Sequence, residues 1–266
     1  MLQQRVSRPT YAGQMHVPGY RPVLTLLAAV LVLTGCTEDN TNANRAPGDE
    51  ITVEEARVLA DVLHRNVEEG GADVTISTQF AEEALLTMSG SIDFTTRMGT
   101  LDTKTTYSDG QPEEVRTIYF TADRILIGNI PGLTDAMAAV DRAGVQYLRS
   151  ELDQAGRLVD NIVGMLTRLA ADQPDDPNNL LLAGYTWQGA GRIDAVLTNT
   201  FSSGEATFSV GVEDRLLHQF AGPPANNTFP VRITLSNHGP RQVDFPPEEQ
   251  VADASAYPEV AAQFGF

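Results

Sequence analysis

The sequence predicts an α+β protein, in which an antiparallel sheet is covered by helices on one face. Three observations support this fold class. Apolar and polar residues alternate with a period of two in two sets of consecutive segments. Apolar residues recur at helical spacing before the first set and between the two sets. Strands and helices do not alternate regularly, which disfavours a parallel sheet.

The first predicted element is a helix between Thr52 and Gly70. Thr52 and Glu55 match a capping box, in which each side chain accepts a hydrogen bond from the other residue's backbone. Apolar residues then recur at helical spacing, and the pair Gly70-Gly71 ends the helix.

The first set of strands follows this helix, and the second set occupies the last third of the chain. The first set covers residues 73–78, 86–94, 99–107, 115–121 and 125–127. The second set covers residues 184–199, 206–212, 214–220, 231–235 and 242–245. Turn-forming Gly, Pro, Asn and Asp residues separate many of these segments.

Two helices are predicted between the two sets, over residues 133–140 and 157–171. The second has the wider apolar stripe, which includes Val163 and Leu166. A loop with two prolines, residues 173–177, follows it. We therefore expect a long apolar helix to be inserted between two halves of one sheet.

The N-terminus has the pattern of a bacterial lipoprotein signal peptide. Residues 1–36 contain three arginines and no acidic residue, and an apolar run from Val23 to Leu33 leads into Leu33-Thr34-Gly35-Cys36. The run is shorter than the roughly 20 residues that span a bilayer. We predict cleavage after residue 35 and lipidation of Cys36, the only cysteine. Two alternatives stay open, a free Cys36 after an ordinary signal peptide and a start at Met15.

These features predict four segments and a location on the extracytoplasmic face of the cell membrane. They are a signal peptide (1–35), a lipidated cysteine with a flexible tether (36–50), a folded domain (51–245) and a loosely ordered acidic tail containing prolines (246–266). Lys104 is the only lysine, a usage typical of GC-rich genomes such as those of actinobacteria.

The charge of the chain argues against nucleic-acid partners. Residues 36–266 hold 15 basic and all 35 acidic residues, a net charge of −20 with neutral histidines. Nucleic-acid binders and proteins that adsorb to anionic lipids need a basic surface. Membrane attachment is therefore expected from acyl chains on Cys36.

No pattern of residues indicates catalysis, a metal site or a cofactor, so we expect a non-enzymatic protein. His64, His218 and His238 are far apart in sequence and match no catalytic motif. The aspartates of residues 172–176 lack the spacing of a calcium loop. The single tryptophan, Trp187, is expected in the core rather than in a ligand platform.

The amount of apolar patterning is large, and it leaves two possibilities for the interior. The helices can fill the space beneath the sheet completely, which gives an ordinary core. They can also leave an apolar slot, which binds a ligand without any catalytic residue.

A group of residues resembles the LppX/LprG (LppX–LprAFG) lipoproteins of mycobacteria and other actinobacteria. The similarity covers most of residues 50–245. Its motifs are the lipobox, Arg65-Asn66, Gly70-Gly71, Leu86-x-Met88-x-Gly90-x-Ile92-Asp93-Phe94, Pro174-x-x-Pro177-x-x-Leu180-Leu181-Leu182 with Trp187, and Ile233-x-Leu235-Ser236-x-x-Gly239.

The resemblance implies a single-domain, half-open antiparallel β-barrel similar to LolA and LolB, wrapped around helices. It also implies that the protein binds an acylated lipid or glycolipid in an apolar slot and helps to move it toward the outer envelope. We expect Met88, Ile92, Phe94, Phe120, Met137, Val163 and Leu166 to line the slot. An envelope sensor that binds a protein partner stays open as the alternative, because the same half-barrel serves such proteins.

Overall fold

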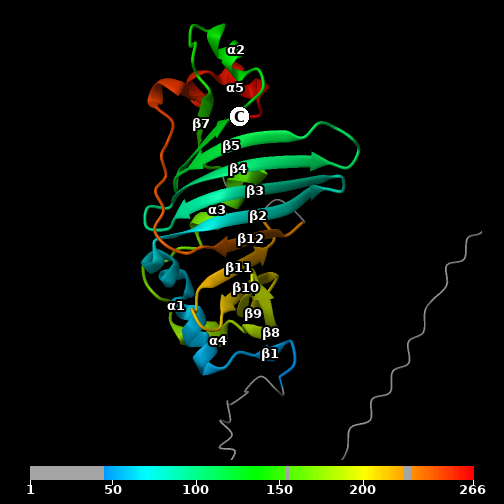
Figure 1. The fold of residues 1–266 in the computed structure, drawn as a ribbon, viewed down its shortest axis with the longest axis vertical. Helices are drawn as coiled ribbons and strands as arrows, with labels where there is room; N and C mark the ends of the chain where they lie inside the picture. The colour runs from blue at the N-terminus through cyan, green and yellow to red at the C-terminus, as the bar shows by residue number, and fades with distance from the viewer. Residues whose placement is uncertain (1–44, 154–155, 225–228) are drawn as a thin grey trace, which may run out of the picture. The chain divides into compact units, whose positions relative to one another are not determined.

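A single curved sheet of thirteen strands forms most of the structure (Figure 1). The computed structural model describes residues 45–153, 156–224 and 229–266. Cys36 lies outside the described residues. The strand order is β1-β8-β9-β10-β11-β12-β2-β3-β4-β5-β6-β7-β13, and every pair is antiparallel except β7 with β13. Because β1 and β13 are edge strands without a further partner in this order, the sheet is not closed among the described residues.

The strands fall into two sets that the helices separate along the chain. The first set is β1 (Asp49–Glu50), β2 (Gly71–Ala81), β3 (Ala84–Asp93), β4 (Met98–Tyr107), β5 (Glu114–Phe120), β6 (Arg124–Gly128) and β7 (Tyr147–Glu151). The second set is β8 (Thr186–Ile193), β9 (Val196–Ser203), β10 (Ala206–Gly211), β11 (Leu217–Gly222), β12 (Val231–Ser236) and β13 (Val251–Asp253). The two sets join in the middle of the sheet, where β12 pairs with β2.

The predicted alternation is confirmed in β2 and β3, whereas the strand predicted over residues 242–245 is wrong, because these residues form no strand. Val74 and Ile76 of β2 are buried, whereas Thr75 between them is exposed. Met88 and Ile92 of β3 are buried in the same way. This period of two gives the sheet one apolar face, which must be covered.

Helix α1 (Val53–Glu69) begins and ends where the sequence predicts. Glu55 N–H donates to Thr52 Oγ1 at 3.2 Å, and Thr52 N–H donates to Glu55 Oε2 at 2.7 Å. Gly70 ends the helix with a φ of 94°, which glycine adopts without steric cost. The capping box therefore fixes the start of the domain's first helix.

The other helices are short. They are α2 (Leu133–Ala138), α3 (Leu158–Thr167), α4 (Pro177–Leu182) and α5 (Pro258–Gln263), with 3₁₀ turns η1 (Glu248–Gln250) and η2 (Ala254–Ala256). The proline-rich loop expected over residues 173–177 leads directly into α4, which the sequence analysis did not predict. Asp176 caps α4 by accepting a hydrogen bond from the N–H of Asn178 at 2.9 Å.

Buried apolar side chains form two clusters. The larger joins the sheet to α1 and α3 and includes Trp187, as expected for a core tryptophan. The smaller lies around α2, β7 and the C-terminal segment. Helices α1 and α3 therefore cover the sheet through one continuous core.

Two expectations about the ends of the domain are wrong. The tether was expected to reach residue 50, yet Arg45 packs over Trp187 and β1 pairs with β8. The tail was expected to be loosely ordered, yet residues 248–263 form η1, β13, η2 and α5. The tail is ordered because β13 bonds to β7 and Val260 is buried, contacts between distant segments that local composition does not encode.

Candidate functional site

Six of the seven predicted lipid-binding side chains lie in one cluster. Each is at most 1% exposed. Four come from the sheet and its turns and two from α3: Met88, Ile92, Phe94, Phe120, Val163 and Leu166. The structure thus brings these six together where α3 meets the sheet, with their side chains excluded from water. That they bind a lipid stays a prediction.

Met137 is the exception. It is fully buried, but it lies in the smaller cluster with Leu133, Leu148 and Val260. Helix α2 packs against β7 and the C-terminal segment, so its apolar face does not share a cluster with α3. Grouping Met137 with the other six residues was therefore wrong, because the sequence does not reveal that α2 has its own partner.

Helix α3 is the central element of the larger cluster. Eight of its ten residues are buried, from Asp160 to Thr167. A helix that is buried on nearly all sides must be surrounded by other elements. Figure 1 shows α3 behind β2 and β3, so the sheet curves across one side of this helix.

A charged pair stands at the start of α3. The Arg157 guanidinium donates to both carboxylate oxygens of Asp160, at 3.0 and 3.1 Å, and to Ser150 Oγ at 2.7 Å. Asp160 is 0% exposed, and this burial raises the pKa of its carboxyl group although Arg157 acts in the opposite direction. The pair fixes one end of α3 to β7, which carries Ser150.

A buried amide holds the other end of this helical segment. Asn66 of α1 is 0% exposed, and its Nδ2 donates to the backbone carbonyl of Leu169 at 2.7 Å. Among the described residues, its Oδ1 has no hydrogen-bond partner. Sequence analysis singled out Asn66 only through the family resemblance, and the structure gives it a specific contact.

A pocket of about 470 Å³ opens beside the start of α3. Its wall combines apolar side chains with three charged ones, Glu114, Arg116 and Arg157. Arg116 pairs with Glu114 at 3.2 Å. The guanidinium carbon of Arg157 lies 4.5 Å from the centroid of the Phe266 ring. The apolar lining residues are Ile127, Ile130, Pro131, Phe264 and Phe266. The sequence analysis missed the two phenylalanines because it treated the acidic tail as loosely ordered.

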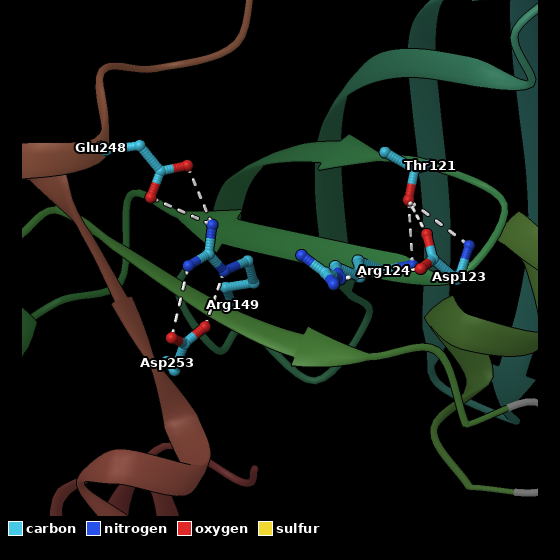
Figure 2. Close-up of polar contacts among 6 residues, drawn as sticks. All are labelled: Thr121, Asp123, Arg124, Arg149, Glu248 and Asp253. Atoms are coloured by element: carbon cyan, nitrogen blue, oxygen red, sulfur yellow. Dashed lines mark hydrogen bonds and ion pairs between the residues drawn. The ribbon is translucent and has the colours of Figure 1, made fainter.

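Arg149 fastens the C-terminal segment to β7 (Figure 2). Its Nε donates to Asp253 Oδ1 at 2.6 Å, and its Nη1 donates to Glu248 Oε1 at 2.9 Å. The hydrogen bond to Asp253 raises the pKa of Arg149, and the same bond lowers the pKa of Asp253. We call these three residues the Arg149 clasp.

A second polar group in Figure 2 closes the turn between β5 and β6. Thr121 Oγ1 donates to Asp123 Oδ1 at 2.6 Å and accepts from Arg124 N–H at 3.1 Å. The hydrogen bond from Thr121 lowers the pKa of Asp123. These bonds are local to one turn and give it a structural role.

The histidines have structural surroundings. His218 Nε2 lies 2.8 Å from Asp214 Oδ2, and the ring of His238 lies edge-on at a centroid distance of 5.2 Å. Burial lowers the pKa of His238, and neighbouring His218 lowers it further. Across the part of the chain that the structure describes, no three His, Cys, Asp or Glu side chains gather as a metal site would require.

Comparisons with solved structures include two distant similarities. An uncharacterized conserved protein from Thermus thermophilus has 11% identity and a TM-score of 0.38, over 75% of this chain and 99% of that chain. A LolA superfamily protein from Nitrosomonas europaea has 10% identity and a TM-score of 0.27, over 73% and 96%. These scores are too low to carry a functional argument.

No protein-family model matches the sequence, and no curated protein matches it. The resemblance to LppX/LprG lipoproteins therefore stays a prediction. Within residues 45–153, 156–224 and 229–266, no helix has the length and apolar character needed to cross a bilayer.

Proposed function

We propose that this chain is a non-enzymatic, lipid-anchored lipoprotein that carries an acylated lipid or glycolipid on the extracytoplasmic face of the membrane. The lipobox at Cys36 supports the anchor. In this proposal the open sheet acts as a half-barrel of the LolA/LolB kind, and the acyl chain lies between the sheet and α3. To lie there, the acyl chain must displace side chains that are at most 1% exposed, such as Val163 and Leu166.

One observation carries the proposal: the middle of α3 is held against the sheet by apolar packing. Val163, Leu166 and Ile162 are each 0% exposed. Apolar contacts have no direction, so acyl chains replace them more readily than they replace a network of hydrogen bonds. The polar contacts described above lie at the two ends, at Arg157 and Asn66, where they can act as pivots.

The pocket beside α3 would be an entrance that suits a ligand with a polar headgroup and an apolar chain. Ile127 belongs both to the pocket wall and to the residues that pack on the larger cluster. Arg116 and Arg157 lie at the same opening. A polar lipid headgroup would lie near these guanidinium groups, which pair with Glu114 and Asp160, while its acyl chain passes Ile127.

The free energy of burying a long acyl chain favours its exchange for side-chain contacts of α3. Each methylene moved from water to apolar surroundings contributes about 0.8 kcal/mol. A chain of roughly a dozen methylenes therefore offsets the loss of several side-chain contacts of α3. Short or strongly polar ligands would not offset that loss, which predicts selectivity for long acyl chains.

Two matched substitutions test the proposal. Val163→Trp places a bulky ring beneath α3, and Met137→Trp places the same ring in the smaller cluster. Both positions are 0% exposed, so both variants carry an overpacking cost, on the order of 1–3 kcal/mol. We expect Val163→Trp alone to lose most of the lipid bound per protein, measured by native mass spectrometry and organic extraction.

Equal lipid binding by the two variants would contradict a site beneath α3. Folding of each variant is checked by circular dichroism, so that unfolded protein is not counted as lipid-free. If the unsubstituted protein neither retains nor takes up lipid, the alternative of an envelope protein that binds a protein partner becomes the working hypothesis.

A further inference from the structure

The apolar end of α4 is exposed to solvent. Leu182 is 85% exposed, more than any other large apolar side chain of the described residues, and Leu181 is 37% exposed. No residue of α4 is buried, although Leu180 packs partly on the larger cluster. The helix thus directs one leucine inward and two outward.

This end of α4 lies beside the start of the folded domain. Ile51 N–H donates at 3.3 Å to the backbone carbonyl of Tyr185. Tyr185 lies three positions after Leu182 in the sequence. Val53, the first residue of α1, is 55% exposed. Figure 1 shows α4 next to α1, with β1 at the same end of the sheet. We call Leu181 and Leu182 the apolar tip.

The chain that leads to Cys36 meets the domain at the same place. Arg45 Nη1 donates to Glu55 Oε1 at 2.5 Å, so the first described residue contacts the first turn of α1. Residue 36 precedes Arg45 by nine positions. An extended chain spans at most about 3.6 Å per residue, so a lipid on Cys36 keeps Arg45 within about 30 Å of the bilayer.

A groove that α1 shares with the start of α4 has a balanced charge, unlike the whole chain. The full sequence has a net charge of −17. The groove between α1, the segment before α4 and the β10–β11 turn is lined by three acidic and three basic residues: Glu54, Asp61, Asp175, Arg57, Arg65 and Arg215. The groove itself therefore adds no net charge to this end of the domain, where Asp49 and Glu50 of β1 are exposed.

We propose that the apolar tip docks into the bilayer that holds the acyl chains of Cys36. This inference rests on the lipid anchor of the proposed function and adds an orientation to it. Docking buries Leu182 and Leu181 at the level of the headgroups and acyl boundary. It orients the domain with α1 and α4 toward the membrane. Because the contact is apolar, it is insensitive to salt.

The test uses the absence of any cysteine other than Cys36. Leu182→Cys gives the lipidated full chain a single free thiol, and Val115→Cys does the same on β5, where Val115 is 46% exposed. Each lipidated protein is added to preformed phosphatidylcholine vesicles and labelled with a membrane-impermeant maleimide. The soluble reference for each is the same substitution combined with Cys36→Ser.

We expect labelling of Leu182→Cys to slow at least fivefold on vesicles relative to its soluble reference, with no change between low and high salt. Labelling of Val115→Cys should change less than twofold. Protein that floats with the vesicles but labels equally fast at both positions would overturn docking and leave the anchor intact.

Two other outcomes also overturn the inference. Protein that does not float with vesicles contradicts the anchor itself, and with it the docking. Protection of Leu182→Cys in the soluble reference, rising with protein concentration, would mean that a second copy of the chain covers the apolar tip instead of the bilayer.

Discussion

The two apolar clusters of this protein are covered by segments that different kinds of interaction hold in place. The larger cluster lies beneath α3 and is closed by apolar side chains such as Val163 and Leu166. The smaller cluster lies beneath the C-terminal segment, which the Arg149 clasp fastens to β7 through charged hydrogen bonds. Non-directional packing can be exchanged for a ligand, whereas a directional clasp fixes one geometry. We therefore propose the first cluster as the ligand site and give the second a structural role.

The largest expected effect comes from matched leucine deletions in the two clusters. Leu166→Ala and Leu148→Ala each remove a side chain that is 0% exposed, so each should lower the free energy of unfolding by about 2–5 kcal/mol. Incubation with a long-chain lipid should restore part of this loss for Leu166→Ala only, measured by denaturant unfolding. Equal rescue of both variants would remove the distinction between the clusters.

The next effect concerns the amide that links α1 to the segment after α3. Asn66→Ala leaves the buried carbonyl of Leu169 without its donor, which should cost about 1–3 kcal/mol. The exposed Asn179 on α4 is the control, and Asn179→Ala should change stability by less than about 0.5 kcal/mol. Similar values for the two variants would show that Asn66 does not hold the segment.

A smaller effect is expected at the Arg149 clasp. Glu248 and Asp253 have side chains that are 78% and 53% exposed, so Arg149→Gln should cost only about 1 kcal/mol, and less at high salt. Hydrogen exchange should accelerate in residues 248–263 and stay unchanged in α3. Acceleration in α3 instead would couple the two clusters and contradict the comparison.

The clasp also has a defined pH dependence. The pKa of Asp253 is lowered in the folded state. Its contribution to the free energy of unfolding is therefore complete above the unfolded pKa of about 3.9, and it is lost as the pH falls through the lowered pKa. Urea unfolding between pH 5 and pH 2 should show this loss for the unsubstituted protein and a weaker one for Arg149→Gln. Identical profiles would exclude the ion pair as the cause.

The smallest effect is a pH dependence near neutrality. His238 has a lowered pKa because it is buried and faces His218, with Asp214 and Glu69 acting in the opposite direction. The folded state therefore binds fewer protons than the unfolded state, and stability falls as the pH drops below about 6.5. The slope stays below about 1.4 kcal/mol per pH unit, the value for one proton. His238→Gln should flatten it in unfolding titrations, and an unchanged slope would exclude His238.

Local patterns predicted most of the secondary structure. The capping box at Thr52, the glycine pair after α1 and the alternation in β2 and β3 depend on neighbouring residues, and the structure confirms them. The segment after residue 245 and the placement of Met137 depend on pairing between β7 and β13. Such contacts join residues about a hundred positions apart and leave no local signal.

The candidate site was predicted only in part, because it also depends on contacts between segments that are distant in the sequence. Alternation indicated which side chains face the interior, and six of the predicted seven share one cluster. The same pattern cannot distinguish a filled interior from an open slot, because apolar residues line both. The pocket beside α3 also needs Phe264 and Phe266, which the tertiary fold brings to Arg157.

The most direct test of the central claim is the mass of the folded domain as purified from cells. Residues 37–266, expressed in an actinobacterial host and purified without detergent, would be measured by native mass spectrometry and then extracted with organic solvent. The proposed carrier predicts a discrete long-chain lipid at about one per protein, or uptake of one on incubation. A mass equal to that of the chain alone, unchanged after incubation with long-chain lipids, would contradict it.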